Sequence, residues 1–313
     1  MPFTAKSGKF NASINTVEIG CGEKAVKIGG ENVLPLYSFD APIENAPKVG
    51  IEITDFGMEN ELDCVKKYYE GCETIADIAK KAASFEGVDF LCFRMEGGDP
   101  NGANKSTEEL ISMLKEVAEA VDLPIAVAGC KNAEKDAELL SKAAEALDGK
   151  NAMLLAAKEE NYKTVGAAAG LAYKQIVGAE SAVDINLAKQ LNVLIGQLGV
   201  NSKSVVMNVG TATAGYGFEY VVSTMDRVKA AALSQNDANL QMPIVTPVAS
   251  EVWAVKEAMA TEADVPEWGD QEERGIDMEI ETAMAVIAAG SNAVILKHPT
   301  SIATISNLVK ELV

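Results

Sequence analysis

The sequence predicts a (β/α)8 TIM barrel that follows an N-terminal β-hairpin. Eight short apolar runs alternate with amphipathic helical stretches from residue 48 onward, which is the pattern of parallel βα units. Eight such units over roughly 265 residues match a barrel, whose usual length is ~250 residues. A doubly wound sheet is the alternative, but the turn after the first run, TDFG at residues 54–57, lacks the glycine fingerprint of dinucleotide-binding sheets.

The N-terminal part of the chain differs from the rest. Residues 14–19 and 25–28 are β-prone runs on either side of the turn sequence GCGE, so we expect them to pair as a hairpin. We therefore divide the chain into an N-terminal extension, residues 1–47, and a barrel domain, residues 48–313.

Apolar periodicity places the individual elements of the barrel. In the predicted helix 107–121, Leu110, Leu114 and Val117 share one face, and charged residues occupy the other. A break in the helical pattern at residues 261–271 indicates a surface insert. The predicted strands are residues 49–53, 89–93, 125–128, 152–156, 175–177, 205–207, 244–246 and 293–296. The predicted helices are residues 74–84, 107–121, 133–147, 162–172, 183–198, 218–233, 272–289 and 302–312.

Composition and charge restrict the possible functions. Apolar residues make up 48% of the chain and charged residues 23%, which is typical of a soluble globular protein. The formal net charge of −19 argues against nucleic-acid and anionic-membrane partners, because both bind clustered Lys and Arg. No apolar run approaches the ~20 residues that span a bilayer, and the opening MPFTAKSGKF lacks the apolar core of a signal peptide. We therefore predict a cytoplasmic protein.

The spacing of the five cysteines matches no common metal motif. An odd number of widely spread cysteines without an export signal also argues against disulfides. We expect free thiols and no metal site at Cys21, Cys64, Cys72, Cys92 and Cys130.

Residues 205–220, VVMNVGTATAGYGFEY, are the strongest candidate for a binding loop. This segment contains the sixth predicted strand, and parallel barrels bind ligands at the carboxyl ends of their strands. Its glycines permit positive φ and close approach of a ligand to the backbone, although three glycines also fit a plain strand-to-helix connection. The candidate ligand-binding residues are Asn208, Gly210, Thr211, Thr213, Gly215, Tyr216 and Gly217.

Other strand ends add charged and polar candidates. Glu96, Asp99 and Asn101 follow the second predicted strand and can bind amide or hydroxyl donors, although acids on loops are commonly only hydrated. Lys297 and His298, the sole histidine, follow the eighth strand. Either can act in catalysis or bind a ligand, but an ion-paired lysine and a hydrogen-bonded structural histidine are the commoner roles.

Catalytic motifs are scarce. The sequence has no Walker A loop, no HExxH motif and no GxSxG motif, and it has no second histidine to activate the thiol of Cys130. The strand ends are therefore better suited to holding a large polar ligand than to breaking bonds. We predict no catalytic residue in this chain.

Three segments resemble one protein family, and the likeness extends over nearly the whole chain. They are GTATAGYGFEYVVSTMDRVKAAAL at residues 210–233, FRMEGGDPNG at residues 93–102 and VILKHPTS at residues 294–301. The family they resemble is the small subunit of the corrinoid iron–sulfur protein of the reductive acetyl-CoA (Wood–Ljungdahl) pathway, in its acetogenic bacterial form. The resemblance implies a heterodimer with a larger subunit that carries a [4Fe–4S] cluster and a cobalamin domain.

The same resemblance implies a role in methyl transfer. The heterodimer would carry a methyl group on cobalt, accept it from methyltetrahydrofolate methyltransferase and deliver it to acetyl-CoA synthase/CO dehydrogenase. The barrel mouth of this subunit would cap the cobalamin at the subunit interface, with the glycine loop against the corrin or its amide side chains. The alternative is a pterin-dependent methyltransferase in which Asp55, Asp99 and Asn208 hold methyltetrahydrofolate, and a third hypothesis is a Schiff-base aldolase that acts through Lys297.

Overall fold

The structure is a computed structural model that describes residues 8–313. Eight parallel strands close into a barrel in the order β10-β3-β4-β5-β6-β7-β8-β9, which confirms the predicted fold. Each predicted barrel strand overlaps an observed strand, because strands buried on both faces are continuous apolar runs. The barrel strands are β3 (Lys48–Thr54), β4 (Phe90–Arg94), β5 (Ile125–Ala128), β6 (Met153–Ala157), β7 (Ile176–Glu180), β8 (Val205–Asn208), β9 (Ile244–Pro247) and β10 (Ser291–Leu296).

The predicted hairpin is present and covers the amino-terminal end of the barrel. Strands β1 (Val17–Ile19) and β2 (Val26–Ile28) pair in antiparallel fashion. Val17, Ile19 and Ile28 are fully buried in one cluster with the side chains that point into the barrel. The hairpin therefore completes the inner core of the barrel. The division of the chain at residue 48 stays a prediction, and residues 1–7 of the predicted extension lie outside the described residues.

Polar contacts anchor the extension to distant parts of the barrel. Lys229 Nζ lies 2.8 Å from Glu31 Oε1 and donates to Asn292 Oδ1 at 2.9 Å. The side-chain amide of Asn292 donates to the same Glu31 oxygen at 2.8 Å. Burial opposes the ionisation of Glu31, but the charge of Lys229 and the Asn292 hydrogen bond outweigh it and hold the pKa of Glu31 below its usual value.

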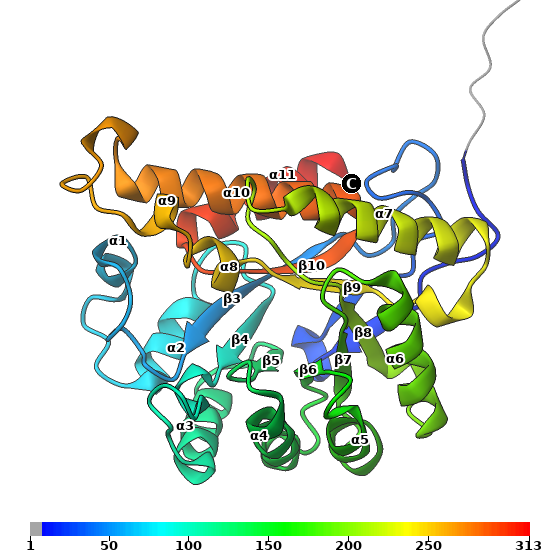
Figure 1. Cartoon of the computed structure of the whole chain (residues 1–313), viewed down its shortest axis with the longest axis horizontal. Helices are drawn as coiled ribbons and strands as arrows, with labels where there is room; N and C mark the ends of the chain where they lie inside the picture. The colour runs from blue at the N-terminus through cyan, green and yellow to red at the C-terminus, as the bar shows by residue number, and fades with distance from the viewer. Residues whose placement is uncertain (1–7) are drawn as a thin grey trace, which may run out of the picture.

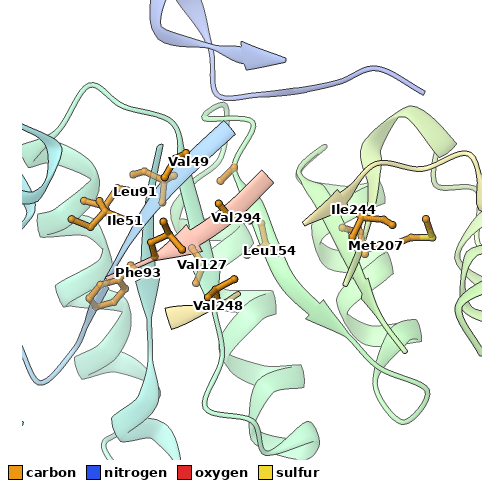
Figure 2. Packing of buried hydrophobic residues seen from close by; sticks show 14 of the residues in the cluster. Val49, Ile51, Leu91, Phe93, Val127, Leu154, Met207, Ile244, Val248 and Val294 are labelled. Atoms are coloured by element: carbon orange, nitrogen blue, oxygen red, sulfur yellow. The ribbon is translucent and has the colours of Figure 1, made fainter. Parts of the chain in front are cut away.

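Helices surround the barrel (Figure 1) and bury the outward-facing strand residues. Figure 2 shows part of this outer core, in which Val49, Leu91, Val127 and Val294 come from different strands. The alternation of inward and outward side chains along each strand thus separates two apolar layers, one inside the barrel and one beneath the helices.

Local sequence signals fix the starts of several helices. Thr74 and Asp77 form a capping box at the start of one helix, and Ser106 caps the next by accepting a hydrogen bond from the backbone N–H of Glu109 at 3.2 Å. The longer helices are α2 (Ile75–Ala83), α3 (Thr107–Ala120), α4 (Ala133–Ala146), α6 (Ile185–Gln197), α7 (Phe218–Ser234), α10 (Gln271–Ala289) and α11 (Pro299–Leu312). The short ones are α1 (Asp63–Lys66), α5 (Tyr162–Val165), α8 (Ala249–Val252) and α9 (Lys256–Met259).

Two predicted segments differ from the structure. The predicted helix 162–172 is α-helical only in α5 and continues as a π-helical segment, Gly166–Ala172. A side chain at Gly170 would collide with Val200, so this segment packs closely on its neighbour. The irregular insert after β9 begins earlier than predicted, because α8, α9 and a 3-10 turn at Pro266–Trp268 all precede α10.

Candidate functional site

Two neighbouring cavities open at the carboxyl-terminal ends of the barrel strands. The first mouth cavity has a volume of about 240 Å³, is walled by the ends of β4 to β9, and is lined in part by Lys158, Glu180 and Asn208. The second mouth cavity has a volume of about 290 Å³ and lies toward β3, β4 and β10, with Glu52 and Asp99 in its lining. The residues shared by both cavities are Arg94, Gly129, Lys131 and Ser250.

Arg94 and Glu52 form a buried ion pair inside the mouth. Arg94 Nε and Nη2 donate to Glu52 Oε2 at 2.9 and 2.7 Å, and the two side chains are only 8% and 2% exposed. Burial opposes both charges, but each charge stabilises the other, so the pKa of Glu52 lies below its usual value and that of Arg94 above it. Within residues 8–313, Nη1 of Arg94 has no hydrogen-bond partner. This nitrogen is therefore free to donate to a ligand oxygen.

Two Lys–Glu ion pairs line the first mouth cavity. Lys158 Nζ lies 3.1 Å from Glu180 Oε1, and the Asn208 amide donates to the other oxygen of Glu180 at 3.2 Å. Across the mouth, Lys131 Nζ lies 3.0 Å from Glu251 Oε1. The mouth is nearly balanced in charge even though the whole chain has a formal net charge of −19. Such a lining offers both hydrogen-bond donors and acceptors, which suits a neutral polar ligand.

Cys130 and Asp136 are hydrogen-bonded to each other, with Asp136 in the lining of the first mouth cavity and Cys130 in that of the second. The backbone N–H and the thiol of Cys130 donate to Asp136 Oδ1 at 2.7 and 3.2 Å. Burial and the nearby Asp136 carboxylate raise the pKa of the Cys130 thiol to about 11. Burial also raises the pKa of Asp136 above its usual value. Gly129 leaves room for this carboxylate, because a Cβ at position 129 would overlap it. The thiol is thus poorly suited to nucleophilic chemistry at neutral pH.

The structure divides the predicted glycine loop between two surfaces. Asn208, Gly210 and Thr211 line the first mouth cavity, and the buried Thr211 Oγ1 has no hydrogen-bond partner in the described chain. Gly210 adopts a φ of +97°, which favours glycine. The remaining residues of the loop lie outside this cavity. Thr213 is buried, Gly215 lines an outer groove beside α7, and Gly217 caps α7. Tyr216 is exposed, and its hydroxyl donates to Glu257 at 2.6 Å.

The charged and polar candidates that follow β4 and β10 also lie in different places. Glu96, Asp99 and Lys297 line the second mouth cavity. Asn101 is exposed on a turn, where its backbone N–H donates to Asp99 Oδ1 at 2.9 Å. Lys297 Nζ contacts both carboxylate oxygens of Glu61 at 2.8 and 2.9 Å. Burial opposes the charge of Lys297, but Glu61 and other carboxylates outweigh it and hold its pKa above the usual value, which disfavours a neutral, Schiff-base-forming amine.

His298 lies in the protein interior rather than in the lining of either mouth cavity. It caps α11, with its Nδ1 accepting a hydrogen bond from the backbone N–H of Thr300 at 3.2 Å. Its ring stacks on Trp253 with 5.9 Å between centroids. Burial lowers the pKa of His298 below its usual value. Its Nε2 lies 3.3 Å from Glu272 Oε1. These contacts give the histidine a structural role.

Sequence reasoning missed several side chains that line the mouth, among them Arg94, Glu52, Lys131, Ser250 and Glu251. Glu52 and Arg94 were recognisable in principle. Each is a charged residue within or directly after a predicted buried strand, and a charge at such a position requires a partner of opposite sign. Lys131 and Glu251 approach each other only through the folded loops, so no local pattern joins them.

Residues 8–313 contain no group of three or more His, Cys, Asp or Glu side chains that could hold a metal ion. In the same residues, no helix has the length and apolar character needed to cross a membrane. The cysteines in this part of the chain are free thiols.

The structure is a (β/α)8 barrel whose strand ends enclose two cavities with polar and charged linings. Among solved structures, dihydropteroate synthase from Xanthomonas albilineans with 4-aminobenzoic acid aligns with a TM-score of 0.56 and 11% identity, covering 95% of this chain and 98% of that one. Dihydropteroate synthase from Coxiella burnetii in complex with pteroic acid aligns with a TM-score of 0.54 and 12% identity, covering 87% and 96%. At these identities the likeness establishes the fold alone.

Sequence comparison identifies the family. The model of the CO dehydrogenase/acetyl-CoA synthase delta subunit matches residues 16–299. Acetyl-CoA decarbonylase/synthase complex subunit delta 1 of Methanosarcina thermophila is 32% identical over 299 residues, which are 94% of this chain and 67% of that protein. The delta subunit of Archaeoglobus fulgidus is 31% identical over 298 residues, which are 94% and 65% of the two chains. The chain therefore belongs to this delta-subunit family, which confirms the resemblance to the corrinoid iron–sulfur small subunit.

Proposed function

We propose that this chain is a non-catalytic subunit of a corrinoid iron–sulfur methyl carrier and that its barrel mouth caps a cobalamin held mainly by a larger subunit. Membership of the delta-subunit family supports the assignment to such a complex. The observation that carries the proposal is the mouth itself. It combines paired charges, amides and hydroxyls, whereas its groups of potential catalytic use are already engaged by other residues.

The residues of the mouth fit the chemistry of a corrinoid. A corrin ring carries carboxamide side chains, which both donate and accept hydrogen bonds. Arg94 Nη1 and the buried hydroxyl of Thr211 have no partner in residues 8–313, and both residues line the first mouth cavity. Cavities of about 240 and 290 Å³ accommodate side chains of the ligand rather than a whole macrocycle. The ring would then lie across the mouth, with Asn208 and Gly210 at its edge.

The partners are part of the proposal and are those that the resemblance to the corrinoid iron–sulfur small subunit implies. The larger subunit would carry the [4Fe–4S] cluster and the cobalamin domain and would form a heterodimer with this chain. Methyltetrahydrofolate methyltransferase would supply the methyl group, and acetyl-CoA synthase/CO dehydrogenase would receive it. Cobalt chemistry would move the methyl group, and the residues of this chain would position the corrin and exclude water. Location in the cytoplasm stays a prediction.

Three side chains with catalytic potential support the non-catalytic assignment. Lys297 is held as a cation by Glu61. His298 is buried and caps α11, so it reaches neither mouth cavity. The Cys130 thiol has a raised pKa and bonds to Asp136. Lys297 and Cys130 are therefore engaged in contacts that oppose their use as a base or nucleophile, and His298 lies outside the lining of both mouth cavities.

The test is co-expression with the candidate larger subunit, followed by purification and a visible spectrum. We expect a stable complex with corrinoid absorbance, whereas the chain purified alone should be colourless and should not retain cobalamin. Tight binding of cobalamin by the isolated chain would contradict the capping role. A wild-type chain that fails to bind the larger subunit would contradict the assignment to this carrier.

The alternative function, a pterin-dependent methyltransferase, can be tested by calorimetry with methyltetrahydrofolate. Of the three residues assigned to pterin binding, Asp55 is already engaged, because it accepts from the backbone N–H of Gly97 at 2.8 Å and pairs with Lys105 at 2.8 Å. Asp99 and Asn208 line different mouth cavities. We expect no submicromolar binding to the chain alone, and such binding would favour the enzyme.

A further inference from the structure

A groove of about 630 Å³ lies on the outside of the barrel beside α7. Helices α7 and α10 run next to each other there (Figure 1), and the Ala214 backbone N–H donates to Thr282 Oγ1 at 3.3 Å, which joins the glycine loop to α10. Ala214, Phe218 and Val222 form the apolar part of the groove. This surface is separate from the mouth cavities, but the same loop connects it to them.

Charged side chains at the groove are predominantly acidic. Glu219, Asp226 and Glu281 carry negative charge, whereas Arg227 is the single basic residue in the lining. All four are exposed, and none of them forms an ion pair within residues 8–313. The groove therefore combines apolar surface with unneutralised acids, a pattern that binds apolar side chains flanked by Lys or Arg.

A second groove on the barrel provides a contrast. The hollow of about 530 Å³ between α3 and α4 includes Ile111 and several charged residues. There Lys142 pairs with Glu145 at 2.9 Å, and Glu138 accepts from the Thr107 hydroxyl at 2.6 Å. The charges of that groove are largely satisfied within the chain, so it lacks the unpaired acidic rim seen beside α7.

We propose that the groove beside α7 binds a segment of the corrinoid-bearing larger subunit that presents apolar side chains between basic ones. This inference rests on the proposed function. Two observations select this occupant. The acidic rim requires a basic complement, and the loop that lines the first mouth cavity at Gly210 and Thr211 reaches the groove at Ala214 and Gly215. A partner that caps the mouth can therefore extend into the groove without a break.

Other occupants fit the groove less well. A second copy of this chain, packed about a two-fold axis, would place the same acidic rim opposite itself, and like charges repel. Nucleic acid and anionic membrane are disfavoured for the same reason, since both carry negative charge. The charge at Glu219, Asp226 and Glu281 thus selects against the commonest alternatives.

Calorimetric titration of the chain with the purified larger subunit tests the inference. Glu219→Lys combined with Glu281→Lys reverses two exposed rim charges with little risk to folding, and Val222→Asp places a charge on the apolar surface. We expect the double charge reversal to weaken association about tenfold at low salt and less at high salt, because exposed charges are screened. Val222→Asp should weaken it at least tenfold. The matched changes Ile111→Asp and Glu108→Lys at the α3–α4 groove should alter it less than twofold.

The outcomes separate the two proposals. If the wild-type chain binds the larger subunit and both α7 variants bind equally well, the groove inference is wrong and the proposed function stands. If the wild-type chain does not bind at all, the proposed function fails. If the chain alone forms dimers that Glu281→Lys dissociates, the occupant is a second copy and the inference is overturned. Thermal unfolding of each variant checks that a lost interaction does not reflect misfolding.

Discussion

The Arg94–Glu52 pair gives the sharpest prediction about the mouth. In Arg94→Met, Glu52 keeps its charge in a site where its side chain is only 2% exposed. Removing one member of a buried ion pair typically costs about 3–5 kcal/mol, because the remaining charge loses its partner but stays buried. We expect a loss of that size in the free energy of unfolding. The double variant Glu52→Leu/Arg94→Met removes both charges and should recover most of the loss.

Urea unfolding followed by circular dichroism measures this effect, with pH as a second variable. In the wild-type chain the pKa of Glu52 is depressed, so its contribution is present above its ordinary pKa and is lost as pH falls through the folded-state value. Without Arg94, the pKa of Glu52 should rise, because burial, the largest influence on it, is then opposed only by the charges of Lys297 and Lys131. The deficit of Arg94→Met should therefore shrink as pH falls and Glu52 takes up a proton. A loss below about 1 kcal/mol, or a double variant as unstable as Arg94→Met, would refute this reasoning.

Three further predictions concern the core and the extension. Ile28→Ala, at a fully buried position of the hairpin, should cost about 2–5 kcal/mol in urea unfolding, yet leave corrinoid retention by the purified complex unchanged. Gly129→Ala should cost about 1–3 kcal/mol because its methyl group overlaps the Asp136 carboxylate, and it should reduce corrinoid absorbance in the purified complex. Because the pKa of Glu31 is depressed, its pair with Lys229 stabilises the fold above pH ~4.5, and this stabilisation decreases as pH falls further. Glu31→Gln should remove this part of the pH dependence of thermal unfolding. A variant with the same pH dependence as the wild-type chain would contradict the prediction.

The barrel was predictable from the sequence, because each of its strands is a short, mainly apolar run between amphipathic helices. Residues 205–207, for example, became β8 with only one residue added, Asn208. The prediction of an α-helix at residues 162–172 was correct only for its first turn, and the reason lies in tertiary packing. Gly166 and Gly170 allow the chain to pack against Leu198 and Val200, and this contact is invisible in local periodicity.

The position of the candidate site could be predicted from the sequence, but the contacts of its side chains could not. Strand ends locate the mouth, yet sequence position does not reveal which side chains other residues engage. Lys297 is paired with Glu61, and its neighbour His298 turns away from the mouth to cap α11. The charges of Arg94 and Glu52 signal that each needs a partner, but local sequence does not show that they pair with each other, because Glu52 lies 42 residues earlier on the adjacent strand. Pairing across strands is a property of register, which emerges only when the barrel closes.

The contacts of the extension also determine when the chain can finish folding. Glu31 is 261 residues from Asn292 and 198 residues from Lys229, and Glu18 is 133 residues from Asn151, which donates to its carbonyl. Contacts with such long sequence separation form late, because large loops must close first. During synthesis on the ribosome, the hairpin emerges early but has no complete binding surface until β10 has been made. The hairpin is therefore made before the barrel but is among the last parts to be secured.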